Sequence, residues 1–102
     1  MITVVNRRTY KGPGEWICRG KSPLGNPFKM KNENDRQKVI EEYKKWISNQ
    51  LKHGNAFIST EYLRLLEMAS KGNLVLICWC APKACHGDVL KEMIEKDLEE
   101  KS

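Results

Sequence analysis

The stretch Leu74–Leu90 constrains the fold of this 102-residue chain more than any other part of it. It reads L-V-L-I-C-W-C-A-P-K-A-C-H-G-D-V-L, so a short apolar run leads through a loop rich in thiols into an amphipathic segment. An apolar run without alternation is typical of the central strand of a parallel sheet that is covered on both faces. The pattern predicts a strand over Leu74–Trp79 and a helix that begins near Gly87 or Asp88.

Two further segments have the composition of strands. Ile2–Asn6 is β-branched and apolar, which favours a first strand, and Trp16–Cys18 favours a brief edge strand inside a long loop. This loop, residues 9–33, is rich in glycine and proline. We expect it to be ordered, because it also carries side chains of the buried type, among them Leu24 and Phe28.

Two segments between the strands have helical spacing of their apolar residues. One covers Asp35–Leu51, with Asn34 or Asp35 placed to cap its start. The second runs to about Ser70 after a cap at Ser59 or Thr60. Its expected inner side comprises Tyr62, Leu63, Leu65, Leu66 and Ala69.

The order strand, helices, strand, helix is that of an α/β protein. We therefore expect one domain over residues 1–102, a small Rossmann-like unit with a short, mostly parallel sheet and about three helices. Hydrophobic residues make up 40% of the chain and charged residues 30%, and no apolar run is long enough to span a bilayer. No secretory signal is visible either, so we expect a cytoplasmic protein whose four cysteines are reduced.

The net charge of +5 is concentrated near the N-terminus, where all but one of the charged side chains in residues 1–31 are basic. Such a concentration favours an anionic partner. A phosphorylated small molecule and nucleic acid both have this chemistry. A solubilising surface is the simpler alternative.

The topology places a candidate binding pocket at one edge of the sheet. In parallel sheets ligands bind beyond the carboxyl ends of the strands, which brings Arg7 and Arg8 beside the loop from Cys80 to Asp88. Arginine suits phosphate, and the N-terminus of the last helix favours anions. The expected binding residues are Arg7, Arg8, Arg19, Lys21, Asn26, His86 and Asp88.

Three residues of the loop are also candidates for catalysis. Cys85 at a helix N-terminus is a candidate nucleophile, with His86 and Asp88 as acid-base groups. The alternative is structural: Asp88 caps the helix and Cys85 packs as a small hydrophobic residue.

The same loop holds four residues that commonly bind zinc, Cys78, Cys80, Cys85 and His86. Structural zinc sites usually take their ligands from two separate segments, and adjacent residues such as Cys85 and His86 fit one ion poorly. We therefore expect neither a metal nor another cofactor.

The motif G-N-P-F at Gly25–Phe28, the run C-W-C-A-P-K-A-C-H-G-D-V-L at Cys78–Leu90 and the opening V-V-N-R-R together resemble a family of small phage and bacterial proteins catalogued as a domain of unknown function. The resemblance covers nearly the whole chain. It implies a small Rossmann-type fold and a phage or mobile-element setting. It also implies one functional surface, formed by Asn6, Arg7, Arg19, Gly20, Gly25, Asn26, Pro27, Cys80, Pro82, Cys85, His86 and Asp88.

Three hypotheses follow. The leading one is the binding of a phosphorylated, nucleotide-like small molecule, which in a phage would allow a host signalling nucleotide to be sequestered. The second is an enzyme that acts on a nucleotide or glycosidic bond through Cys85, His86 or Asp88. The third is a nucleic-acid-binding module that uses the basic N-terminal segment.

Overall fold

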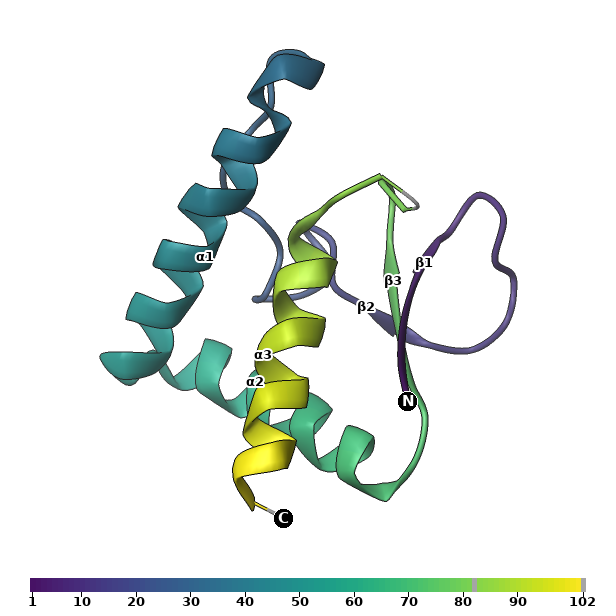
Figure 1. The fold of residues 1–102 in the computed structure, drawn as a ribbon, viewed down its shortest axis with the longest axis vertical. Helices are drawn as coiled ribbons and strands as arrows, with labels where there is room; N and C mark the ends of the chain where they lie inside the picture. The colour runs from purple at the N-terminus through teal and green to yellow at the C-terminus, as the bar shows by residue number, and fades with distance from the viewer. Residues whose placement is uncertain (82, 102) are drawn as a thin grey trace.

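The computed structural model describes residues 1–81 and 83–101 and contains a sheet of parallel strands with helices packed on it (Figure 1). Strand β3 (Leu74–Cys78) lies between β1 (Ile2–Asn6) and β2 (Glu15–Trp16). Val4 of β1 pairs with Leu76, and Trp16 of β2 pairs with Ile77. The α/β class and the parallel sheet are confirmed; the Rossmann-like description stays a prediction.

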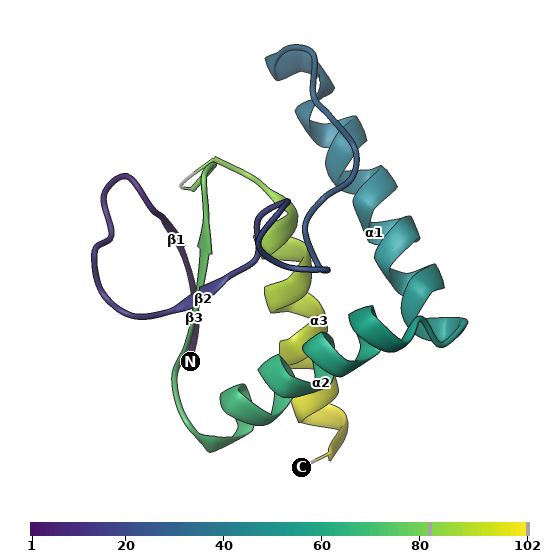
Figure 2. The ribbon, with the colours of Figure 1, turned by 180° about the vertical axis from the view of Figure 1, so that it is seen from behind.

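The two faces of the sheet are covered differently. The three helices lie on one side of the sheet, and the loop between β1 and β2 lies on the other (Figures 1 and 2). Leu74, Leu76 and Cys78 of β3 belong to the core under the helices. Gly14 lies against the side chains of Val75 and Ile77 on the opposite face, at distances that leave little room for a Cβ atom. A loop therefore covers the face that helices cover in larger α/β sheets.

Helix α1 (Arg36–Lys52) follows a short 3-10 helix, Glu33–Asp35. Asp35 holds the N-cap position of α1, as predicted, but its side chain makes no capping bond. The capping bond lies one turn earlier, where the side chain of Asn32 accepts from the N–H of Asn34. The extra 3-10 turn moves the start of the helical segment, and with it the cap, toward the N-terminus.

Helix α2 (Ala56–Lys71) begins earlier than its predicted cap at Ser59 or Thr60. The Oδ1 atom of Asn55 accepts from the N–H of Ile58, and an extended asparagine directly after the turn at Gly54 fulfils the capping role. Leu63, predicted on the inner side, is 57% exposed, because it lies about 100° around the helix from Tyr62, beside the buried stripe.

Helix α3 (His86–Lys101) packs against β1 and β3, and its fully buried residues Leu90 and Ile94 fill the core. It begins at His86, slightly before the predicted start. Among the residues that the structure describes, no helix has the length and apolarity needed to cross a membrane.

The loop between β2 and α1 is ordered by burial, as predicted. Ile17 and Leu24 are fully buried, and the Tyr43 hydroxyl of α1 donates a hydrogen bond of 2.7 Å to the carbonyl of Leu24. Gly25 allows a close backbone approach, since a Cβ atom there would lie 2.6 Å from the backbone of Arg19. Helix α1 thus fixes the middle of this loop.

Replacing Tyr43 by Phe should lower the free energy of unfolding by about 1–3 kcal/mol, because the buried Leu24 carbonyl loses its donor. Urea unfolding followed by circular dichroism measures this loss. Tyr10→Phe is the matched control, since Tyr10 donates to the Pro13 carbonyl in an exposed setting. Equal losses in the two variants would contradict the role assigned to Tyr43.

Candidate functional site

A cavity of about 280 Å³ opens at the carboxyl end of the sheet. Its walls come from four segments: the loop after β2, the start of α1, the loop after β3 and the N-terminus of α3. Most of its lining is apolar. The lining residues are Cys18, Arg19, Asn26, Phe28, Met30, Arg36, Val39, Ile40, Trp79, Cys80, Ala84, Cys85 and His86.

His86 is the buried polar residue of the cavity wall, with 8% of its surface exposed. Its Nε2 atom lies 2.5 Å from the carbonyl oxygen of Ile17, so Nε2 carries the proton and donates it. The ring of Tyr43 packs edge-on against the imidazole, with 5.2 Å between centroids. Two neighbouring elements thereby fix both the tautomer and the orientation of His86.

The fixed tautomer leaves the Nδ1 atom of His86 as a hydrogen-bond acceptor. Within the described part of the chain Nδ1 makes no hydrogen bond, and it is not among the atoms shut off from solvent. His86 lines the cavity, so this accessible acceptor is a candidate contact for a ligand there. Burial lowers the pKa of His86 below its usual 6.5. The imidazole is therefore neutral at neutral pH and presents a lone pair to the cavity.

Arg19 supplies the uncompensated positive charge of the cavity. Its Nε atom donates to the Asn26 carbonyl over 2.9 Å, and Nη2 donates to the Phe28 carbonyl over 3.3 Å. Both acceptors are neutral, and none of the ion pairs among the described residues includes Arg19. The loop thus orients the guanidinium group without neutralising it.

Asn26 adds hydrogen-bond donors beside Arg19. Its Oδ1 atom accepts from the N–H of Phe28 over 2.9 Å, which holds the G-N-P-F turn. Its Nδ2 atom makes no hydrogen bond within the described part of the chain and stays open to a ligand. The arginine and the amide together can bind an anionic oxygen and a neighbouring carbonyl or hydroxyl.

Arg36, which the sequence analysis missed, also lines the cavity, from the first residue of α1. Its guanidinium binds both carboxylate oxygens of Glu33, at 2.8 and 2.9 Å, and donates to the Ala84 carbonyl over 2.7 Å. The bonds from Arg36, together with one from the Nζ atom of Lys83 over 3.2 Å, lower the pKa of Glu33 to about 2. Arg36 is therefore an ion-paired residue that links α1 to the loop after β3. The pair Glu33 and Arg36, three residues apart in the sequence, is the signal that could have identified it.

Cys85 and Asp88 form a reciprocal cap at the start of α3. The Sγ atom of Cys85 accepts from the N–H of Gly87 over 3.3 Å, and the Asp88 carboxylate accepts from the N–H of Cys85 over 3.0 Å. Asp88 lies outside the cavity lining. The geometry favours the structural alternative for both residues. Of the three catalytic candidates, His86 is the one that lines the cavity and has a ring nitrogen, Nδ1, without a hydrogen bond in the described part of the chain.

A second thiol lies beneath the cap. The Sγ atoms of Cys85 and Cys78 are 3.5 Å apart, and the hydrogen bond from Cys85 lowers the pKa of Cys78 while it raises the pKa of Cys85. Cys85 reaches the cavity but its pKa is raised, whereas the pKa of Cys78 is lowered but its side chain is fully buried. Neither thiol therefore combines access with acidity, which a nucleophile requires.

Of the four residues weighed for zinc, Cys78 and Cys85 are in contact, but no third ligand joins them in the described part of the chain. Within residues 1–81 and 83–101, no group of three or more His, Cys, Asp or Glu residues is arranged to hold a metal ion. Cys80 lies beside Arg36 at the cavity wall, and the Nε2 atom of His86 is engaged by Ile17. The described side chains therefore offer no metal site.

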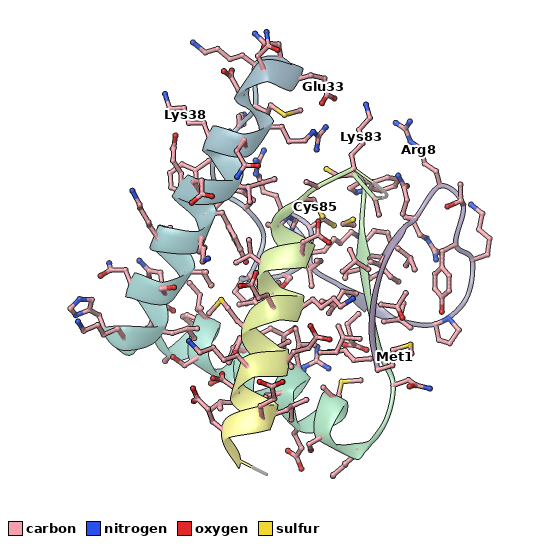
Figure 3. All side chains as sticks on the ribbon, in the orientation of Figure 1. Met1, Arg8, Glu33, Lys38, Lys83 and Cys85 are labelled. Atoms are coloured by element: carbon pink, nitrogen blue, oxygen red, sulfur yellow. The ribbon has the colours of Figure 1, made fainter. Side chains whose placement is uncertain are left out.

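The basic residues of the predicted pocket separate into two groups. Arg19 lines the cavity, whereas Arg7, Arg8 and Lys21 lie outside its lining. Arg7 and Lys21 pack over the ring of Trp16, at 5.3 and 6.0 Å from its centroid. Arg8 projects from the end of β1 into solvent (Figure 3). Arg19 and His86 thus lie at the same cavity, whereas Arg7 and Lys21 lie at Trp16 and Arg8 lies in solvent.

Asn6 explains why the opening V-V-N-R-R belongs with the cysteine-rich loop. Its Nδ2 atom donates to the carbonyls of Trp79 and Ala81, at 3.1 and 2.9 Å, and its Oδ1 atom accepts from the N–H of Arg8. The end of β1 is thus clamped to the loop after β3. Gly20 and Pro27 lie in exposed turns around Arg19 and Asn26, and Pro82 lies outside the described residues.

The profile of a family described as "Domain of unknown function (DUF4326)" matches residues 4–96, which include every wall of the cavity. The chain belongs to this family. The resemblance inferred from the motifs is thereby confirmed. No curated protein and no solved structure matches the chain.

The lowered pKa of His86 makes the stability of the DUF4326 chain dependent on pH. The unfolded chain takes up a proton on this histidine near pH 6.5, before the folded chain does. The free energy of unfolding should therefore fall as the pH drops below about 6.5, by at most about 1.4 kcal/mol per pH unit for this proton. Urea titrations at pH 7.5, 6.5 and 5.5 measure it. His86→Gln, which cannot titrate, should lose this part of the pH dependence, and an unchanged profile would contradict the assignment.

Cys85→Ala should lower the free energy of unfolding by about 1–2 kcal/mol at pH 7, because the N–H of Gly87 loses its cap. Cys85→Ser keeps an oxygen acceptor at the same place and should recover most of this loss. Urea unfolding of the two variants distinguishes them. A serine variant as unstable as the alanine variant would show that the cap contributes little.

Proposed function

We propose that the cavity binds a small phosphorylated molecule that carries a flat ring, a mononucleotide in size and chemistry. The observation that carries this proposal is Arg19, whose guanidinium is oriented by two carbonyls but not neutralised. A charge held in this way at an apolar cavity favours a phosphate, which accepts two parallel hydrogen bonds from arginine.

The remaining walls suit the other parts of such a ligand. Phe28, Ile40 and Trp79 offer apolar and aromatic surface for a base, while the Nδ1 atom of His86 and the Nδ2 atom of Asn26 can pair with hydroxyl or base-edge groups. The volume of about 280 Å³ is just below the usual range of about 300–1,000 Å³ for ligand pockets. This favours one nucleotide over a dinucleotide.

An enzyme acting on a nucleotide or glycosidic bond is the second candidate. The neutral imidazole of His86 favours it, since a histidine with a free nitrogen lone pair can act as a general base. Incubation of each nucleoside monophosphate with the protein, followed by mass spectrometry, separates the two candidates. Recovery of the intact nucleotide supports binding alone, as sequestration of a signalling nucleotide requires. An altered product that disappears in His86→Gln supports the enzyme.

Titration calorimetry with the four common nucleoside 5′-monophosphates tests the binding proposal. At least one should bind, and its unphosphorylated nucleoside should bind at least tenfold more weakly. Arg19→Gln keeps a donor for the loop carbonyls but removes the charge, and it should weaken binding by about 10- to 100-fold. Lys21→Ala is the control and should leave the affinity unchanged, because Lys21 lies outside the lining.

Two outcomes would contradict the proposal. One is the absence of binding with all four monophosphates. The other is an Arg19→Gln variant that binds as tightly as the unmodified chain.

A further inference from the structure

An aromatic and cationic surface continues from the mouth of the cavity. It comprises Arg7, Trp16, Lys21 and Trp79, which we call the rim surface. The rings of Trp16 and Trp79 lie 5.9 Å apart at a tilt of 49°, and Arg7 and Lys21 pack over Trp16. Since Trp79 also lines the cavity, the rim surface and the cavity share a wall.

The cations of the rim surface are not neutralised. None of the ion pairs among residues 1–81 and 83–101 includes Arg7 or Lys21. Glu15, the acid next to Trp16, is occupied by Arg64 over 2.6 Å. Arg8 extends the positive charge at the end of β1 (Figure 3). This part of the molecule therefore favours an extended anion.

Trp79 is the ring that the rim surface offers for stacking. Its exposed fraction is 51%, which is large for a tryptophan, while Trp16 is covered in part by the two cations and by Trp79 itself. The bond from Asn6 to the Trp79 carbonyl holds its backbone in place. Exposed aromatic rings beside cations are the usual means of binding single-stranded nucleic acid, in which bases stack and phosphates pair.

We propose that the ligand is the end of a single-stranded oligonucleotide, with its terminal nucleotide in the cavity, the next base on Trp79 and the following phosphates beside Arg7 and Lys21. This inference rests on the proposed function, because the cavity takes the terminal nucleotide. It adds a substrate class: the cavity has room for one nucleotide, and the rim surface provides a path along which the strand continues.

The test compares a nucleoside monophosphate with single-stranded tetranucleotides of thymidine and of adenosine, each carrying a 5′ or a 3′ phosphate. One tetranucleotide should bind at least tenfold more tightly than the monophosphate of the same base and should quench tryptophan fluorescence. Its affinity should also fall more steeply with salt, since each phosphate contact to a single strand adds about 0.7 to the slope.

Variants of the rim surface distinguish it from the cavity. Arg7→Ala and Lys21→Ala should each weaken tetranucleotide binding roughly fivefold at low salt and flatten the salt slope by about 0.7, while monophosphate binding stays unchanged. Lys52→Ala is the matched control: Lys52 is exposed at the other end of α1, about 25 Å from Arg36. It should change neither affinity.

The outcomes separate this inference from the proposed function. If the monophosphate binds and no tetranucleotide binds more tightly, the inference is overturned and the proposed function stands. Equal weakening by Lys52→Ala and Arg7→Ala would also overturn the inference, because it indicates nonspecific attraction. Tetranucleotide binding that Arg19→Gln leaves unchanged would overturn the inference, because the strand then does not enter the cavity, while the monophosphate titration decides the proposed function. The absence of any binding would overturn both.

Discussion

The hydrogen bond from His86 to the Ile17 carbonyl is the interaction on which the rest of the site depends. Ile17 also donates its N–H to the Ile77 carbonyl of β3, so one residue joins the loop after β2 to the sheet and to the N-terminus of α3. Tyr43 of α1 packs against the same imidazole, and its hydroxyl donates a hydrogen bond to the Leu24 carbonyl. Because a buried carbonyl without a donor is costly, the position of His86 and the path of the loop are determined together.

The loop fixed in this way gives the cavity its chemical character. Arg19 lies two residues after the buried Ile17. Its guanidinium is oriented by hydrogen bonds to two carbonyls of the same loop. Arg36, on the other wall, is neutralised by Glu33. The two arginines therefore differ in role although both line the cavity: Arg36 stabilises the wall, and Arg19 retains a charge for a ligand. A count of basic residues could not make this distinction, since it depends on which partners surround each guanidinium.

Much of the fold follows from local patterns. The apolar run after Gly72 could be identified as the central strand because burial on both faces requires such a run, and the helical spacing located all three helices. The capping residues were less predictable. Several polar residues near each start can form a cap, and the choice of Asn32 and Asn55 depends on backbone geometry that tertiary packing sets. Leu63 was predicted on the inner side for a related reason. The apolar stripe of α2 is broad, and the sequence pattern alone does not show which edge of it contacts the core.

Apolar periodicity and strand direction were enough to predict the order of the elements and the parallel sheet, because both constrain topology. They also predicted that Arg7 and Arg8 would meet the loop after β3, whereas in the structure Arg19 is the arginine of the two loops that lines the cavity. The tertiary structure decided what each functional group does there. It assigned Cys85 and Asp88 to a cap, placed Arg7 and Lys21 on Trp16, and gave His86 a single tautomer. The physical reason is that the role of a polar side chain is set by its partners within about 3 Å, and these partners come from segments far apart along the chain.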